Sequence, residues 1–100
     1  MKVKSMEYYE IIYDGELSDR DEFEMECKGY RSHVKVKIGE FFYPVCFYDP
    51  GRLAQDIEDE EFIAEPGLII IKNVTKEEIE KAVEKAIKEG FFFHIVPCKE

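Results

Sequence analysis

The stretch HVKVKIGEFFYPVCFY, residues 33–48, decides the fold, because it encodes two strands and the reversal between them. In residues 33–38, valine and isoleucine alternate with lysine, which is typical of a strand with one buried face. Gly39-Glu40 then separates this strand from residues 41–48, and a two-residue loop with glycine first predicts a type II′ hairpin turn. The two strands are therefore expected to pair antiparallel from this turn outward.

Pro44 lies where the hairpin register predicts a sheet edge. It falls opposite Lys35 in a pair that exchanges no hydrogen bonds, so its missing N–H turns away from that neighbouring strand. Residues 41–48 are therefore expected to form an edge, at least around Pro44.

The same register predicts an apolar strip on the sheet face opposite the core. On the edge strand it consists of Phe42, Pro44, Cys46 and Tyr48. Its neighbours on the adjacent strand are His33, Lys35 and Lys37. An apolar strip bordered by charge is typical of a partner-binding surface, where aromatic side chains supply much of the binding energy. The alternative is that the loop 14–21 or a helix covers the strip.

Two more strands are expected upstream of the hairpin. Residues 6–13 leave little polar character on either face, which favours an interior strand. After a polar loop, apolar residues alternate with glutamates in residues 23–27. Antiparallel pairing of 23–27 with 33–38 would set the glutamates of one strand opposite the lysines of the other, Glu26 facing Lys35.

Asp49-Pro50 marks the start of a helix downstream, because the carboxylate can accept the first free amides and proline suits the first helical position. This helix is expected to end near Glu61. Its buried stripe is expected to consist of Leu53, Ala54 and Ile57. Beyond Pro66-Gly67, residues 68–71 are all aliphatic, which favours a short strand buried on both faces.

A second helix follows a capping box at residues 75–78 and continues, with apolar residues at helical spacing, to Gly90. Residues 91–96 then predict a last strand. Residues 68–71, this helix and residues 91–96 would form a right-handed β-α-β crossover.

The predicted fold class is α+β, with a mostly antiparallel sheet of about six strands and two helices in the order β-β-β-β-α-β-α-β. Residues 1–100 are expected to form a single domain, since no linker, repeat or low-complexity segment interrupts them. Hydrophobic residues make up 45% of the chain, enough for a core despite a net charge of −9.

The negative charge is unevenly distributed. Residues 1–65 carry 17 acidic and 8 basic side chains, whereas residues 66–100 carry six of each. Two acidic clusters stand out: Asp19, Asp21 and Glu22, then Asp56, Glu58, Asp59, Glu60 and Glu61. A one-sided field speeds the approach of an oppositely charged partner, so both clusters are candidates for a steering role. The alternative is that they are ordinary surface acidity. Neither has the spacing of a calcium loop, and no metal site is predicted.

Several function classes find no support in the sequence. Three cysteines without a C-x-x-C pair encode neither a disulfide framework nor a zinc ribbon. His33 and His94 have no nucleophile signature beside them, and no phosphate-binding or dinucleotide motif occurs, so no catalytic residue and no cofactor are predicted. Three arginines in an acidic chain argue against nucleic-acid binding. No apolar run suits a signal peptide or a membrane span, which predicts a cytoplasmic chain without membrane contact.

Two hypotheses for function follow. Under the first, the chain is a protein-binding domain for a basic partner. In size, acidity and lack of a catalytic motif it resembles the small acidic immunity and antitoxin proteins that neutralise basic nuclease toxins in bacteria, and this resemblance implies a basic protein partner. Under the second, it is a small enzyme or ligand-binding domain with a pocket between sheet and helices. The strip, or the free edge near Pro44, could equally pair a second copy in a homodimer.

Overall fold

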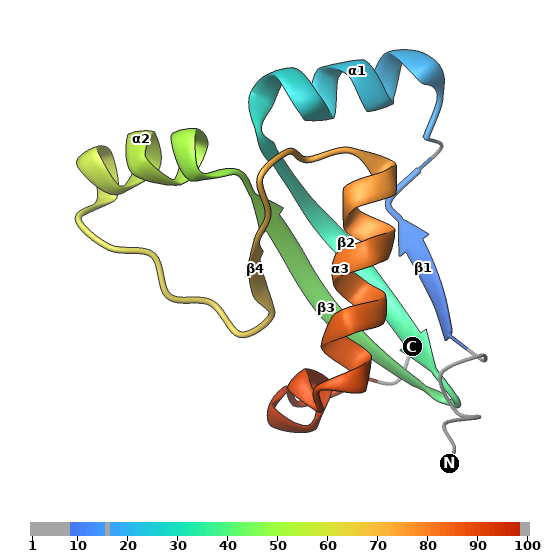
Figure 1. Ribbon diagram of the computed structural model, residues 1–100. Helices are drawn as coiled ribbons and strands as arrows, with labels where there is room; N and C mark the ends of the chain where they lie inside the picture. Colours follow the sequence, from blue (N-terminus) through green and yellow to red (C-terminus); the bar gives the residue numbers. More distant parts are fainter. Residues whose placement is uncertain (1–8, 16, 99–100) are drawn as a thin grey trace.

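A four-stranded sheet forms the centre of the structure, a computed structural model that describes residues 9–15 and 17–98 (Figure 1). The strands are β1 (Tyr9–Tyr13), β2 (Tyr30–Ile38), β3 (Phe41–Tyr48) and β4 (Leu68–Ile70), in that order across the sheet. The first three run antiparallel, and β4 runs parallel to β3. Over the described residues the order is β-α-β-β-α-β-α, which confirms an α+β fold with a mostly antiparallel sheet and corrects the expected six strands and two helices.

The central hairpin forms as the sequence predicts. Gly39 has a φ of 64°, whereas the next residue, Glu40, has no positive φ, as a type II′ turn requires. The pairing starts with Ile38 opposite Phe41 and passes through Lys37 opposite Phe42. This register separates the two faces of β2 and β3.

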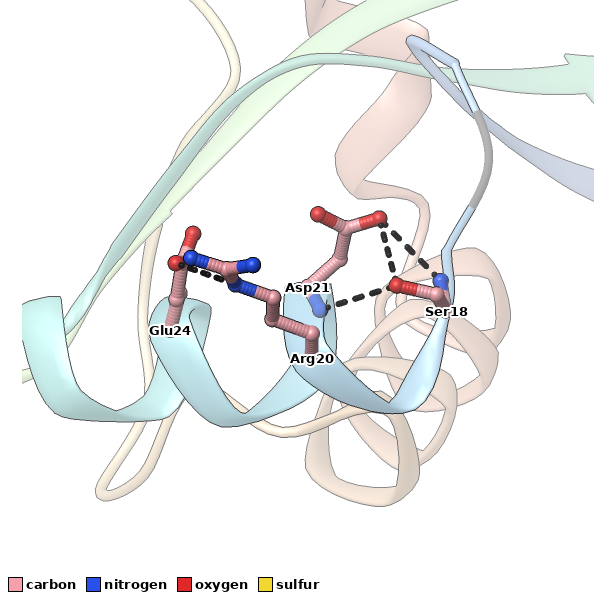
Figure 2. A network of polar contacts seen from close by, with 4 residues as sticks. All are labelled: Ser18, Arg20, Asp21 and Glu24. Atoms are coloured by element: carbon pink, nitrogen blue, oxygen red, sulfur yellow. Dashed lines mark hydrogen bonds and ion pairs between the residues drawn. The ribbon is translucent and has the colours of Figure 1, made fainter.

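Residues 23–27, predicted as a strand, belong instead to the helix α1 (Asp19–Lys28). The Ser18 hydroxyl accepts a hydrogen bond from the Asp21 amide at 3.2 Å, and the Asp21 carboxylate accepts one from the Ser18 amide at 3.2 Å (Figure 2). Alternation over five residues does not distinguish a strand from a helix that buries a single side chain, here Met25. The capping residue that precedes the alternation decides in favour of the helix.

Because α1 is not a strand, the lysines of β2 face β1 instead of the predicted glutamates. Lys35 lies opposite Ile12, and Lys37 lies opposite Glu10. Among the described strands β1 pairs only with β2, so it is an edge and not the interior strand that was expected. β1 is rich in apolar residues because one of its faces packs against the core, through Tyr9, Ile11 and Tyr13. Residues 6–8 of the predicted strand lie outside the described residues.

Both predicted helices after the hairpin are present. α2 (Pro50–Glu60) begins after Asp49, as its N-cap predicts. α3 (Lys76–Lys88) begins after Thr75 and lies along one face of the sheet (Figure 1). The core lies between α3 and this face, and its most deeply buried side chains are Val34, Val36, Phe47, Val74, Ile79 and Val83.

The prediction that residues 91–96 form a last strand is wrong. The chain turns at Gly90, where φ is 78°, and continues as a short 3-10 helix, η2 (Phe91–His94). The ring of Phe92 is buried with its centroid 5.4 Å from that of Tyr43, and Ile95 is buried as well. Packing against the core therefore orders this segment instead of strand pairing. The predicted crossover is wrong as well, since the parallel pair is β3 and β4, joined through α2.

The free edge predicted for residues 41–48 is confined to Pro44. On the side of β3 away from β2, the Cys46 amide donates to the Gly67 carbonyl at 3.1 Å. Phe42 exchanges two backbone hydrogen bonds with Cys98, of 3.0 and 2.7 Å. Gly67 approaches so closely that a Cβ there would overlap the Pro44 carbonyl oxygen. β3 is therefore paired on both sides before and after Pro44.

Candidate protein-docking surface

The predicted apolar strip on β3 is exposed along only part of its length. Phe42 is half-buried, whereas Cys46 and Tyr48 are 4% and 6% exposed. The ring of Tyr30 lies 4.7 Å from that of Tyr48, centroid to centroid, and the Cys46 thiol donates to the Glu65 carboxylate at 3.2 Å. The expectation of an exposed surface is therefore wrong for Cys46 and Tyr48. Both are covered, although Tyr30 and Glu65, which contact them, belong neither to the loop 14–21 nor to a helix.

The charged neighbours of the strip remain at the surface. Lys35 and Lys37 lie on the face opposite α3, because they alternate with the buried valines of β2. The Lys37 ammonium is 5.7 Å from the centre of the Phe42 ring. His33 is exposed at a β-bulge, with a φ of 60° and its Nδ1 2.9 Å from Ser32 Oγ. The two lysines favour an acidic partner over a basic one. Partner binding by this face is not tested by the structure and stays a prediction.

Exposed apolar residues and negative charge occur together on a different segment, the α2 arm, which we define as residues 50–66. Figure 1 shows this arm extending sideways from the sheet, beyond β4 and away from α3. No side chain of α2 is buried, so the expected core stripe of Leu53, Ala54 and Ile57 is wrong. Ile57 is 39% exposed, and Phe62 just after the helix is 71% exposed.

The second predicted acidic cluster lies on this arm. Its members are Asp56, Glu58, Asp59, Glu60 and Glu61. Asp56 is paired with Arg52, Oδ1 to Nε at 2.9 Å. The other four are exposed and form no ion pair with any residue that the structure describes. The α2 arm therefore combines a negative field with accessible apolar side chains.

The first acidic cluster has a local structural explanation. Asp19, Asp21 and Glu22 occupy the first turn of α1, at the end of that helix on the β1 side and not the end toward α2 (Figure 1). Hydrogen bonds from the Ser18 amide and hydroxyl lower the pKa of Asp21. Negative charge also stabilises the start of a helix through its dipole. A steering role for this cluster stays a prediction.

The base of the α2 arm is fixed by contacts to the end of α1. The Asp49 amide donates to the Gly29 carbonyl at 2.9 Å, and a Cβ on Gly29 would overlap the Asp49 carboxylate. Arg52 donates to the Lys28 carbonyl at 3.2 Å, and its guanidinium carbon lies 5.1 Å from the centre of the Tyr30 ring. These contacts hold α2 away from the core face of the sheet.

A cavity of about 440 Å³ lies between the arm and the end of β3. Residues that matter for its chemistry are Tyr30, Tyr48, Arg52, Asp56, Glu60 and Glu65. Burial, followed by the neighbouring Tyr30 and Asp56, raises the pKa of Tyr48 to about 12. Burial and the hydrogen bond to Glu65 raise the pKa of Cys46 to about 12, so its thiol stays protonated and unreactive near neutral pH. The sequence does not predict this cavity, because Tyr30, Tyr48 and Glu65 in its lining are far apart along the chain.

A second cavity, of about 300 Å³, lies between α1 and β2 and is the place to look for the enzyme or ligand-binding alternative. It is lined by residues including Asp14, Asp21, Arg31 and His33. The Arg31 guanidinium donates to the Asp14 carbonyl at 3.2 Å. Across residues 9–15 and 17–98, no group of three or more histidine, cysteine, aspartate or glutamate side chains is arranged to hold a metal ion. None of the helices in that part of the chain is long and apolar enough to cross a bilayer.

Comparisons with known proteins add no assignment. No protein-family model matches the chain, and neither a curated protein nor a solved structure is significantly similar to it.

Proposed function

We propose that this chain is a protein-binding domain that docks on a basic partner through the α2 arm. The observation that carries the proposal is the exposure of Ile57 and Phe62 beside four exposed carboxylates that form no ion pair with a described residue. An isolated helix of 11 residues is only marginally stable in water, and no side chain of α2 is fully buried in this domain, where Leu53 is half-buried. Contact with a partner would provide the burial that the sheet does not.

Charge and apolar area would contribute in different ways. The negative field of the arm speeds encounter with a positive surface, and this effect weakens as salt is raised. Burial of Ile57 and Phe62 removes apolar area from water and so slows dissociation. The partner expected from this chemistry has an apolar site bordered by lysine and arginine. A nuclease is one example of such a partner, since nucleases bind phosphate through clustered basic residues.

A second copy of the chain is the competing occupant of the arm. The face that carries Lys35, Lys37 and the half-buried Phe42 offers positive charge and apolar area, which is complementary to the arm. The oligomeric state therefore has to be measured in the same experiment.

The test compares capture from native lysate by the wild type, by an arm variant and by a matched control. The arm variant is Ile57→Ser with Phe62→Ser. The control is Phe93→Ser with Val96→Ser, which changes two apolar residues that are 89% and 84% exposed elsewhere. We expect the wild type and the control, but not the arm variant, to retain a basic protein. That protein, expressed alone, should associate with the chain at a rate that falls steeply with ionic strength.

Four outcomes would contradict the proposal: no basic protein captured by the wild type, retention of the basic protein by the arm variant, loss of it by the control, or an association rate that is indifferent to salt. A dimer in sedimentation analysis that the arm variant abolishes, without any basic protein captured, would replace the basic partner by a second copy.

A further inference from the structure

The cavity between the α2 arm and β3 has the chemistry of a site for an organic cation, and we infer that it receives a lysine or arginine side chain of the basic partner. The inference rests on the proposed function for the identity of that partner, although the cavity can be probed without it. With a volume of about 440 Å³ and an opening to solvent, it has room for a guanidinium or ammonium group and part of its alkyl chain.

The lining of the cavity carries an excess of negative charge. It contains three carboxylates, Asp56, Glu60 and Glu65, and one cationic side chain, Arg52. Arg52 is already engaged by Asp56 at 2.9 Å. Glu60 and Glu65 form no ion pair with any other described residue, so their two charges are not neutralised within this part of the chain. An entering cation would therefore be attracted, and an anion repelled.

Aromatic rings form the wall of the cavity toward the sheet. The ring centroids of Tyr30 and Tyr48 are 4.7 Å apart, with an angle of 58° between the ring planes. The Arg52 guanidinium carbon lies 5.1 Å from the centre of the Tyr30 ring, and Phe62 adds another ring to the lining. One face of this wall thus already holds a guanidinium group. Cation–π attraction favours arginine and lysine over neutral side chains at such a wall.

The Tyr48 hydroxyl adds a polar group to the lining of the cavity. Tyr48 as a whole residue is only 6% exposed, and no hydrogen bond joins its hydroxyl to another described residue. The hydroxyl oxygen is not itself buried, because among the described residues the buried side-chain oxygen without a partner is that of Tyr13. An incoming N–H group can donate to the Tyr48 oxygen while it pairs with the glutamates.

The experiment is a titration of the folded, ¹⁵N-labelled chain, followed by amide chemical shifts at low salt. The probes are N-acetyl-arginine methylamide and its citrulline counterpart, which has nearly the same shape without the charge. We expect the arginine probe to cause saturable shifts in the amides of Tyr48, Arg52 and Glu65. The citrulline probe should cause small shifts that do not saturate. Added salt should weaken the binding of the arginine probe.

A pair of charge-neutralising variants separates a local site from a general field. Glu60→Gln with Glu65→Gln should lower the affinity for the arginine probe roughly tenfold, because hydrogen bonds between charged groups are stronger than those between neutral groups. The matched control is Glu26→Gln with Glu77→Gln, which removes the same net charge at two exposed glutamates and should leave the affinity unchanged. Equal binding of the two probes, equal weakening by both variants, or no saturable shifts would overturn the inference.

Failure of the cation site can be distinguished from failure of the proposed function, because the probe titration and the capture experiment are independent. If the arm still captures a basic protein while the arginine probe fails to bind, only the assignment of the cavity is overturned. If the probe binds as expected but no basic protein is captured, the cation site is supported and the proposed function is contradicted.

Discussion

α2 and α3 begin in the same way but have different surroundings. Each follows a residue whose side chain accepts a hydrogen bond from the amide three positions along the chain. The Asp49 carboxylate accepts from the Arg52 amide at 2.8 Å, and the Thr75 hydroxyl accepts from the Glu78 amide at 3.2 Å. Both helices then carry apolar residues at helical spacing.

The apolar faces of the two helices are used differently. Ile79 and Val83 of α3 are fully buried against the sheet, whereas Ile57 of α2 is 39% exposed. An amphipathic pattern indicates that the apolar face of a helix is stabilised by burial, but it does not indicate which surface buries it. The core face of the sheet is occupied by α3 (Figure 1), so the face of α2 is left for solvent or for a partner. Five measurements test how far this contrast holds.

The largest effect is expected for Ile79→Ala in α3. Ile79 is fully buried, and truncation of such a residue removes apolar contacts and leaves a cavity. We expect the free energy of unfolding, measured by urea denaturation, to fall by about 2–5 kcal/mol. A loss below about 1 kcal/mol would mean that α3 is not the main cover of the core.

Gly67→Ala tests how the far end of the α2 arm is attached to the sheet. Gly67 has a φ of 84°, and a Cβ there would overlap the Pro44 carbonyl oxygen. We expect a loss of more than about 1 kcal/mol in unfolding free energy. Gly39→Ala is the matched control, because Gly39 has a φ of 64° but no atom within 4 Å of its Cβ position. If both variants lost the same stability, the backbone conformation alone would matter and the close approach would not.

The two N-caps can be compared directly. Thr75→Ala should lower the global free energy of unfolding by about 1 kcal/mol, because α3 is coupled to the core. Asp49→Ala should lower it less and should instead speed amide hydrogen exchange within α2, because that helix can open locally. Equal global losses for the two variants would show that α2 unfolds together with the core.

Alkaline pH tests the contact between the arm and the sheet at Cys46. Burial raises the pKa of this thiol in the folded chain from 9.0 to about 12. Above pH 9.0 the unfolded thiol ionises while the folded thiol stays protonated, so the unfolded state binds fewer protons and stability falls as pH rises toward 12. We expect a shallower fall in Cys46→Ala, as measured by urea denaturation between pH 8 and 11. Tyr13 and Tyr48, whose pKa values are also raised to about 12, and Tyr9, whose pKa is raised by burial, should contribute to the fall that remains.

The smallest effect is expected for Ile57→Ala in α2. Surface substitutions away from packed features change stability by less than about 0.5 kcal/mol, and Ile57 has no buried neighbour on its own helix. The same variant should still weaken the capture of a basic partner. A loss of 2 kcal/mol or more in the isolated chain would show that α2 packs against the domain and would remove the basis for the docking surface.

Elements with strong local chemistry were predictable from the sequence. The turn at Gly39-Glu40 and the caps at Asp49 and Thr75 act within a few residues, and all three are found where expected. The helix α1 was not predicted, because its short alternation of apolar residues and glutamates suits a strand and the cap at Ser18 was not recognised. η2 was missed because three consecutive phenylalanines suit a strand as well as a packed turn.

The candidate site was predictable only in its charge. The acidic residues of the α2 arm could be identified from composition, but the exposure of Ile57 could not, because its spacing is the same as that of a core residue. The cavity requires Tyr30 of β2, Tyr48 of β3 and Glu65 of the arm to meet. That meeting depends on the register across a bulge and on the close approach of Gly67 to Pro44.

Turns, caps and net charge are properties of short segments, and for this protein the amino-acid sequence alone determines them. Which apolar face is covered and which stays open depends on contacts between distant segments. Those contacts compete for a single core face, and only the folded chain decides that α3 occupies it and the α2 arm does not.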